Sequence, residues 1–384
     1  MNLCNKKKCT GCSACKAICP VHAISMKKDE RGFLNPDINE NLCVSCGLCE
    51  KVVIELNNHL NIGEHKDKPK KAYAIINNNY EKRISSQSGG LFYALAETIL
   101  DLKGIVYGCA YLDNHHVAHC RIDNKKDLNS LRGSKYVQSD MNNCLESLID
   151  DLKNDRIVLF SGTPCQVAGV ESLLRTKKVN TEKFYSCDFI CHGVPSPKLY
   201  EDYLEFIQNK YSSKIKKVNL RDKSKGGWNN HMESIELENG EIFLGKYYVD
   251  LFYSNLGLRS ACESCEYTNL NRPSDITMAD CWGIEKKYPQ LWNDNKGISL
   301  GIIQTDKGSK LFELSKKYLE YFELKEEEYI QPQLVYSSKT PIYKEKFWND
   351  YKKLPFENIL KKYTIYGGIP FKIKRKALKA IKWW

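Results

Sequence analysis

The stretch that decides the fold of this chain is Cys9-Thr10-Gly11-Cys12-Ser13-Ala14-Cys15-Lys16-Ala17-Ile18-Cys19-Pro20. Its cysteines are separated by two, two and three residues, and a proline follows the last one. A cubane iron-sulfur cluster needs four soft thiolates that converge on one small volume, and two-residue gaps wrap a tight loop around one face of it. The spacing therefore predicts a 4Fe-4S site; a zinc or disulfide knot is the less favoured alternative.

A second run, Cys43-Val44-Ser45-Cys46-Gly47-Leu48-Cys49, follows along the chain. The two runs together resemble the duplicated bacterial ferredoxin fold, in which the fourth cysteine of each run binds the cluster of the other run. Crossing the runs in this way predicts two sites. The complete one consists of Cys19, Cys43, Cys46 and Cys49.

The partner site has the three cysteines Cys9, Cys12 and Cys15, but Val53 stands where its fourth cysteine is expected. Cys4 is one candidate for the missing thiolate. Without it, the site would hold a three-iron cluster, a labile four-iron cluster or no cluster.

The composition supports metal or redox chemistry inside the cell. The chain has 384 residues, 42% of them hydrophobic and 27% charged, as in soluble globular proteins of two or three domains. No segment has the 18 or more apolar residues that a membrane span requires, and cysteines occupy the N-terminus where a signal peptide needs an apolar core. We therefore expect a cytoplasmic protein, whose 17 cysteines are more useful as ligands than as disulfides.

The formal net charge of +11 does not by itself indicate a nucleic-acid partner. An oxidised 4Fe-4S core with four thiolates carries about −2, so two or three clusters remove roughly 4 to 6 positive charges. The sequence has no zinc-finger histidine pair and no aromatic RNA-binding signature. No nucleic acid is expected among the partners.

Composition divides the chain into four parts. Residues 1–60 are dense in cysteine, and residues 61–70 are polar and charged as in a linker. Residues 71–310 alternate strand-like and helix-like runs, and residues 311–384 are rich in lysine and tyrosine and expected to be mostly helical.

The alternation in residues 71–310 predicts an α/β core, with an antiparallel insertion at 214–244 that turns at 238–241. The fold class is therefore α+β or α/β, a two-cluster ferredoxin-like domain followed by a mixed α/β domain. Strands are expected at 72–76, 104–111, 156–160, 184–190 and 298–303, and helices at 88–102, 141–152, 166–174 and 197–208.

Several glycine-containing turns lie where helices start. Ser85–Gly90 precedes the helix near Leu91, and free amides at such a start suit a phosphate or the edge of a flavin ring; a simple serine-rich helix cap is the alternative. Ser161–Gln166 follows a strand and opens a helix, which places Cys165 at the carboxyl edge of the sheet, where ligands of open α/β sheets bind.

These turns belong to a longer set of motifs, in consistent order over residues 5–305. They are Gln87-Ser88-Gly89-Gly90, Gly133-Ser134-Lys135-Tyr136, Gly162-Thr163-Pro164-Cys165-Gln166, Cys191-His192-Gly193-Val194-Pro195-Ser196-Pro197, Arg221-Asp222-Lys223 with Gly227-Trp228, Cys262-x2-Cys265, Arg272-Pro273-Ser274-Asp275-Ile276-Thr277 and Asp280-Cys281-Trp282-Gly283. With these motifs the chain resembles the beta subunits of coenzyme F420 hydrogenases and dehydrogenases, in versions with an N-terminal ferredoxin-type domain. The resemblance implies an FAD-dependent oxidoreductase with an additional iron-sulfur cluster.

Carried over residue by residue, the resemblance implies two further sites in residues 71–310. The FAD site consists of Gln87, Ser88, Gly89, Gly90, Lys135, Gly162, Thr163 and Pro164. The additional cluster draws on Cys165, on Cys187 or Cys191, and on Cys262 and Cys265; a zinc half-site or buried thiols are the alternative for the last two.

The expected reaction is electron transfer between a one-electron carrier such as ferredoxin, the clusters and FAD, with hydride transfer to or from a small substrate or a deazaflavin. If a proton is needed, His192 is the best placed catalytic side chain, although a structural histidine is the alternative. Arg221, Lys223 and Lys225 form a cationic patch that suits an anionic substrate or is simply a solvated loop.

Two questions about function stay open at the level of the sequence. The first is whether the chain is instead a ferredoxin-type electron-transfer or interaction protein that binds no flavin and serves surface-polysaccharide biosynthesis. The second concerns residues 371–384, whose basic and apolar residues suit peripheral contact with an anionic membrane or a helix docked on the protein.

Overall fold

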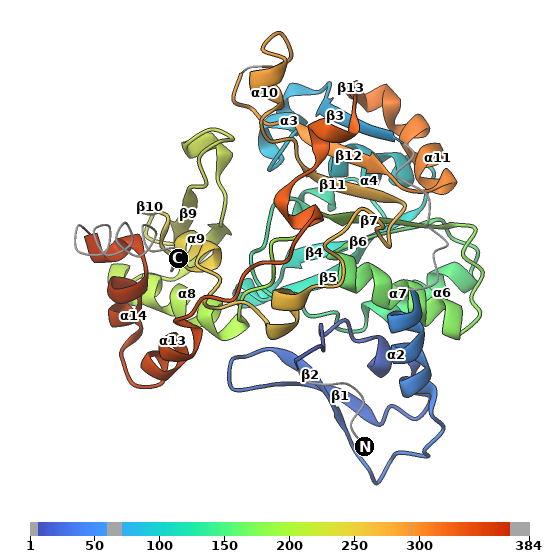
Figure 1. The fold of residues 1–384 in the computed structure, drawn as a ribbon, viewed down its shortest axis with the longest axis horizontal. Coiled ribbons are helices and arrows are strands. Elements are labelled where there is room, and N and C mark those ends of the chain that lie inside the picture. The colour runs from blue at the N-terminus through green and yellow to red at the C-terminus, as the bar shows by residue number, and fades with distance from the viewer. Residues whose placement is uncertain (1–6, 60–70, 293, 369–384) are drawn as a thin grey trace.

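The computed structural model describes residues 7–59, 71–292 and 294–368 (Figure 1). It has an N-terminal cysteine-rich domain, a large mixed sheet covered by helices on both faces, and a second lobe beside the sheet. The predicted fold class, a ferredoxin-like region followed by a mixed α/β domain, is confirmed. Cys4 and residues 371–384 lie outside the described residues.

The N-terminal domain lies below the large sheet in Figure 1. Each of its two helices begins within a cysteine run, and a β-hairpin joins them by antiparallel pairing of Ile24 with Ile38 through Lys28 with Leu34. This arrangement places both cysteine runs at the starts of helices. The elements are α1 (Ala14–Ile18), β1 (Ile24–Lys28), β2 (Leu34–Ile38) and α2 (Leu48–His59).

The large sheet has eight strands in the order β13-β3-β12-β11-β7-β6-β4-β5. Its four central neighbours β11, β7, β6 and β4 are parallel, and the outer pairs are antiparallel. The carboxyl ends of the parallel strands therefore meet at one edge, where α/β proteins bind ligands. The strands are β3 (Lys71–Asn77), β4 (Ile105–Tyr111), β5 (Val117–Ile122), β6 (Val158–Gly162), β7 (Phe184–Phe189), β11 (Ile276–Asp280), β12 (Ser299–Ile303) and β13 (Leu319–Leu324).

Helices cover both faces of this sheet because its strands are apolar on both sides. In β6, Leu159 packs in the core beneath α4 (Leu91–Asp101) and α11 (Asp306–Ser315), whereas its neighbours face α6 and α7. Alternation of this kind is expected for a strand buried on both faces. The other helices of this layer are α3 (Tyr80–Ser85), α5 (Leu128–Leu131), α6 (Cys144–Lys153), α7 (Pro164–Thr176), α10 (Ile284–Lys287) and α12 (Glu326–Tyr329).

The second lobe is an insertion between β7 and β11, completed by the last helices of the chain (Figure 1). It contains a three-stranded antiparallel sheet, and the predicted turn at 238–241 joins two of its strands. The lobe has its own aromatic core. Its elements are α8 (Pro197–Tyr211), β8 (Ile215–Asn219), β9 (Glu233–Leu237), β10 (Ile242–Gly245), α9 (Tyr247–Tyr253), α13 (Lys344–Tyr351) and α14 (Phe356–Tyr363).

All five predicted strands and all four predicted helices of residues 71–310 are present, with ends shifted by a few residues. Three strands of the sheet were not predicted: β5, β11 and β13. β13 shows that residues 311–384 are not all helical and that the large sheet continues past residue 310. Within the described part of the chain, no helix is long and apolar enough to cross a membrane.

The N-terminal domain packs on α7. Helices α1 and α2 share a hydrophobic core with α7, and the Ser172 hydroxyl donates a hydrogen bond to the Val52 carbonyl at 2.7 Å. A Cβ atom on Gly169 would lie 2.8 Å from both Cβ and Sγ of Cys12. Glycine at this position therefore lets the first cysteine loop approach the helix backbone.

Replacing Gly169 with valine is expected to lower the free energy of unfolding by about 1–3 kcal/mol, because the new side chain overlaps Cys12. Iron bound per chain should fall as well. The same substitution at Ser147, an exposed residue of α6, is the control and should change neither quantity appreciably. Thermal unfolding and iron analysis under anaerobic conditions check this; wild-type values for Gly169→Val would contradict the packing.

Candidate functional site

The predicted complete site of the N-terminal domain is assembled in the structure. Four of its cysteines line one small cavity together with apolar side chains of β1 and β2. All are free thiols, three of them half-buried and Cys46 exposed, so the donors that a cluster needs are present around one cavity. The four are Cys19, Cys43, Cys46 and Cys49.

The three remaining cysteines of this domain lie next to α7. Burial raises the pKa of the Cys15 thiol, and the neighbouring Cys12, Cys9 and Cys49 raise it further, so these sulfurs are close to one another. Val53 is half-buried against the same core and offers no donor atom. Cys9, Cys12 and Cys15 therefore form an incomplete set within the described residues.

A third set comes from three distant segments of the large domain. Cys165 lies in the first turn of α7, and Cys191 follows β7. Cys262 lies within the short 3-10 turn η3 (Ser260–Ser264), and Cys265 directly follows it. Burial raises the pKa of Cys165 to about 12, and Cys265 and Cys262 add to that rise. Cys191 likewise has its pKa raised by burial and then by Cys262, Cys165 and Cys265. The four thiols therefore gather around one place.

Cys187 lies elsewhere. It is fully buried within β7, and its pKa is raised to about 12 by burial, with Ser161 as hydrogen-bond partner and Asp188 and Asp275 as charged neighbours. Of the two cysteines that the sequence left open, the structure brings Cys191 to the set and leaves Cys187 in the core. Cys281 is also buried away from the set.

No group of three or more His, Cys, Asp or Glu side chains in residues 7–59, 71–292 and 294–368 is close enough to hold a single metal ion. A cubane cluster takes each thiolate on a different iron, so its ligands stand further apart than those of one ion. A thiol that binds a metal loses its proton, so the raised pKa values of the buried cysteines do not prevent them from serving as ligands.

The set Cys9, Cys12 and Cys15 and the third set, which contains Cys165, are neighbours at α7. Cys12 contacts Gly169, one helical turn after Cys165. Tyr267, which is 5% exposed, lies near both sets: burial raises the pKa of its hydroxyl, and the charges of Cys165, Cys12 and Cys265 raise it further.

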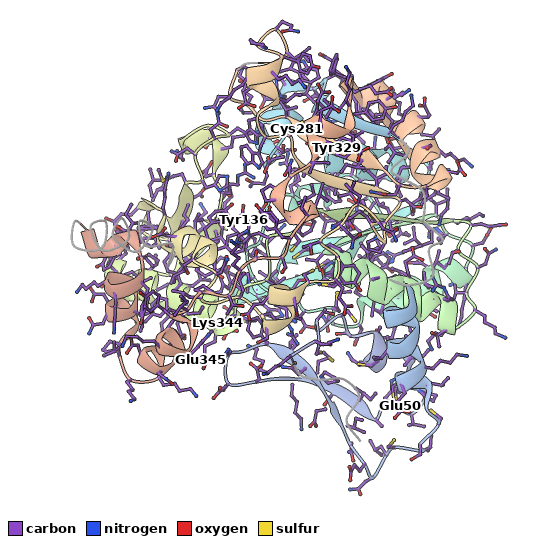
Figure 2. All side chains as sticks on the ribbon, in the orientation of Figure 1. Glu50, Tyr136, Cys281, Tyr329, Lys344 and Glu345 are labelled. Atoms are coloured by element: carbon purple, nitrogen blue, oxygen red, sulfur yellow. The ribbon has the colours of Figure 1, made fainter. Side chains whose placement is uncertain are left out.

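A cavity of about 450 Å³ opens at the carboxyl edge of the parallel strands. Its wall includes Cys165 and Cys191 of the third set and Thr10 of the first cysteine loop. Tyr136, which Figure 2 places near the centre of the molecule, lines it from the side of the second lobe and stacks on Phe252 at 4.5 Å between ring centroids. The volume and the apolar lining with a few polar groups are typical of a small-molecule site.

The structure places most of the predicted FAD residues on this cavity. Gln87, Ser88, Gly90, Lys135, Gly162 and Thr163 line it. Gly89 and Pro164 shape its wall without lining it. A Cβ on Gly89 would collide with the backbone of β3 and β12, and Pro164 is the first residue of α7.

Lys135 has no donor left for a ligand. Its ammonium group donates hydrogen bonds to the carbonyls of Arg132 at 2.7 Å, Cys109 at 2.8 Å and Ser130 at 3.2 Å, and burial lowers its pKa to about 8. Arg132, on the same turn, also lines the cavity, and its buried Nε has no hydrogen-bond partner. Nη1 of Arg132 donates to the Ser85 hydroxyl, and the guanidinium lies 5.4 Å from the ring centroid of Tyr93. No carboxylate among the described residues pairs with Arg132, so its charge fits the phosphate of a bound nucleotide.

Gln87 offers a second unpaired group. Its side-chain oxygen is buried without a partner, whereas its amide nitrogen donates weakly to Asn219 at 3.4 Å. A free acceptor and a free cation on one cavity wall fit a ligand that carries both a hydrogen-bond donor and an anion, as FAD does.

His192 lines the cavity but has both ring nitrogens engaged. Nε2 lies 2.7 Å from Oδ1 of Asn255, Nδ1 lies 3.4 Å from Nε2 of Gln333, and the ring packs edge-on against Phe252 and Tyr253. Burial lowers its pKa, so it is neutral at pH 7. This geometry favours a positioning role over proton transfer.

The predicted cationic patch is largely neutralised. Arg221 pairs with Asp280 at 2.6 Å, and Asp280 also accepts a hydrogen bond from the Trp228 indole at 2.6 Å. Lys223 donates to the carbonyls of Arg83, Ser88 and Lys296, and burial lowers its pKa to about 7. Only Arg221 of the three cations lines the cavity.

Sequence reasoning missed the roles of Arg132, Tyr267 and Arg259. Arg132 is visible in the sequence only as a cation next to a glycine turn, where Lys135 is the more prominent candidate. Tyr267 and Arg259 flank the Cys262–Cys265 pair, but nothing in the sequence shows that this segment meets the N-terminal domain.

Replacing Cys191 with alanine is expected to remove one cluster, about four iron atoms and four sulfides per chain, because it takes one ligand from the third set. Cys187→Ala is the matched control and should keep its iron, since that thiol lies in the core. Iron and acid-labile sulfide analysis after anaerobic reconstitution checks this. Loss of iron from the Cys187 variant alone would reverse the assignment.

Comparison with known proteins gives one match for the N-terminal domain and another for the large domain. Residues 155–327 match the family model for the C terminus of the coenzyme F420 hydrogenase/dehydrogenase beta subunit, and residues 8–52 match the 4Fe-4S dicluster domain. A subunit of the F(420)H(2) dehydrogenase of Methanosarcina mazei is 22% identical over 326 residues, which cover 82% of this chain and 84% of that protein.

Among solved structures, a chain of the xenon-derivatised F420-reducing NiFe hydrogenase complex from Methanosarcina barkeri is similar, with a TM-score of 0.47 and 16% identity. The match covers 67% of this chain and 84% of that chain. The family models confirm the resemblance noted in the sequence: the chain matches a 4Fe-4S dicluster domain and, after it, the C-terminal part of the coenzyme F420 hydrogenase/dehydrogenase beta subunit.

Proposed function

We propose that this chain is an iron-sulfur flavoprotein oxidoreductase that exchanges single electrons through its clusters and electron pairs through FAD. The observation that carries the proposal is the cavity at the carboxyl edge of the sheet. Cys165 and Cys191 form part of its wall, and so do the predicted flavin turns and Thr10 of the dicluster domain. A cofactor in this cavity would touch both the third cysteine set and the dicluster domain.

The route for electrons follows from the order of the cysteine sets. The set on Cys19 and Cys43–Cys49 lies outermost, the set on Cys9–Cys15 meets α7, and the set on Cys165 borders the cavity. FAD, when bound, supplies the conversion between one-electron and two-electron transfer. The protein supplies short separations and a cavity with an apolar lining.

The residues around the cavity hold FAD by complementary groups. Gly90, at φ +94°, precedes α4 and offers no side-chain cap to it, and Arg132, which has no carboxylate partner among the described residues, provides a cation for the diphosphate. Gln87 provides an acceptor. His192 orients the aromatic wall formed by Phe252 and Tyr253.

The second half of the cavity is suited to a planar substrate. Trp282 lines it, stacks on Trp228 at 4.6 Å and lies beneath the Arg221 guanidinium at 5.3 Å. Because the relatives are named for coenzyme F420, we propose a deazaflavin or another planar hydride carrier as the substrate. A ferredoxin or a neighbouring enzyme subunit would be the one-electron partner, since a relative is itself a subunit.

The first experiment is to measure FAD per chain in anaerobically purified protein by fluorescence after acid release. One FAD per chain is expected. Protein with intact clusters that refuses FAD on reconstitution would contradict the proposal and favour an electron-transfer or interaction protein without flavin.

Replacing Arg132 with methionine is expected to weaken FAD binding at least tenfold, because it removes the unpaired cation of the cavity while keeping side-chain volume. Arg156→Met is the control, since Arg156 lies outside the cavity wall. Equilibrium dialysis of FAD against the cluster-loaded proteins checks this. Equal affinities of the two variants would show that the phosphates bind elsewhere.

A further inference from the structure

Arg259 joins the large domain to the first cysteine loop. It is 4% exposed and immediately precedes η3; its backbone amide donates to the Val194 carbonyl. Its side chain reaches into the dicluster domain. Nε donates to the Cys9 carbonyl at 2.6 Å, and Nη2 donates to the Leu34 carbonyl at 3.0 Å and to Oδ1 of Asn35 at 2.7 Å.

The guanidinium stands between two cysteine sets. Burial raises the pKa values of both Cys12 and Cys262, and the positive charge of Arg259 opposes the rise at each of them. No carboxylate among the described residues forms an ion pair with Arg259. The guanidinium lies over the ring of Phe33, at 5.2 Å from its centroid, and its positive charge acts on thiols of both sets.

Three buried donors around the first loop have no hydrogen-bond partner: Nη1 of Arg259, Nε2 of Gln138 and Oγ of Ser13. The first two face the same residue. A Cβ on Gly11 would lie 3.2 Å from Nη1 of Arg259 and would collide with Nε2 of Gln138. Gly11 has φ +73°, so this position both requires glycine and keeps the space between the donors and the loop free.

An unpaired buried donor is destabilising, so three of them at one loop call for acceptors. The backbone carbonyls nearby are already used by Nε and Nη2 of Arg259. Because Gly11 lies within the Cys9–Cys15 loop, the sulfurs of a cluster bound by this loop would be the acceptors next to these donors. Hydrogen bonds to cluster sulfurs and nearby charge are the means by which proteins tune cluster potentials.

We propose that Arg259 and Gln138 of the large domain set the reduction potential of the cluster bound by Cys9, Cys12 and Cys15. A reduced cluster carries one more negative charge than the oxidised one, so a fixed cation and two N–H donors stabilise the reduced form and raise the potential. The cluster nearest α7 thereby becomes a favourable acceptor for one electron. This inference rests on the iron-sulfur part of the proposed function and does not depend on FAD.

The test is an EPR-monitored redox titration of the full-length, anaerobically reconstituted protein. Arg259→Met is expected to lower the ratio of reduced to oxidised cluster at a given potential about tenfold, which for one electron is a shift of about 59 mV to more negative potential. Arg259→Lys keeps the charge and should keep most of the wild-type potential. Gln138→Glu keeps the acceptor for the Leu34 amide, replaces the donor with a carboxylate and should shift the potential in the same direction as Arg259→Met.

Variants of other residues assign the EPR signals to their clusters and serve as controls. Cys46→Ala and Cys265→Ala each remove one of the other two clusters and so identify their signals. The Cys19/Cys43/Cys46/Cys49 cluster should keep its potential in every Arg259 and Gln138 variant, and Arg156→Met should shift none.

Unshifted potentials in Arg259→Met and Gln138→Glu, with iron content preserved, would overturn the proposal. If Arg259→Met loses iron because the domains no longer dock, Gln138→Glu decides alone. Equal shifts at all clusters would also overturn it, since they would show a general change in solvation. Failure to bind FAD would leave the expected shifts unchanged, and so separates this inference from the flavin proposal.

Discussion

The packing of α7 against the dicluster domain is the contact on which the rest of the arrangement depends. One end of this helix provides Cys165, and one turn later its backbone at Gly169 lies against Cys12. Electron transfer between buried centres requires short separations, and a side chain at residue 169 would push the two domains apart. The helix therefore covers one face of the sheet and also sets the spacing between the cysteine set that contains Cys12 and the one that contains Cys165.

Buried lysines show how the cavity wall is kept rigid. Lys135 and Lys223 each donate to three backbone carbonyls, although burial lowers the pKa of both. Each ammonium group thereby holds three backbone positions together. A lysine held in this way no longer serves a ligand, and the unpaired Arg132 is then left as the cation of the flavin turn.

Local patterns predicted the local parts of this protein well. The cysteine spacing, the glycine turns and the apolar periodicity identified the dicluster domain, the cavity wall and most strands, because each depends on neighbours in the chain. β11 and β13 were missed although they are no shorter than the predicted β6 and β12, because their pairing with neighbouring strands in the fold decides them. The choice of Cys191 over Cys187 depends on which residues lie beyond the end of β7 and which within it. The meeting of Arg259 with Cys9 depends on the docking of two domains, which no pattern within either segment contains.

The third cysteine set also has a topological effect. The chain leaves the large sheet at Cys191, forms α8, β8, β9, β10 and α9, and returns at Cys262. A cluster that holds both cysteines closes this loop at its base, as a disulfide would, and so restricts the unfolded chain as well as the folded lobe. Tyr253 and Phe252 of that lobe line the cavity. Loss of a cluster bound there would therefore loosen the wall of the cavity on the side of that lobe and, in the proposed function, remove one centre of the electron route.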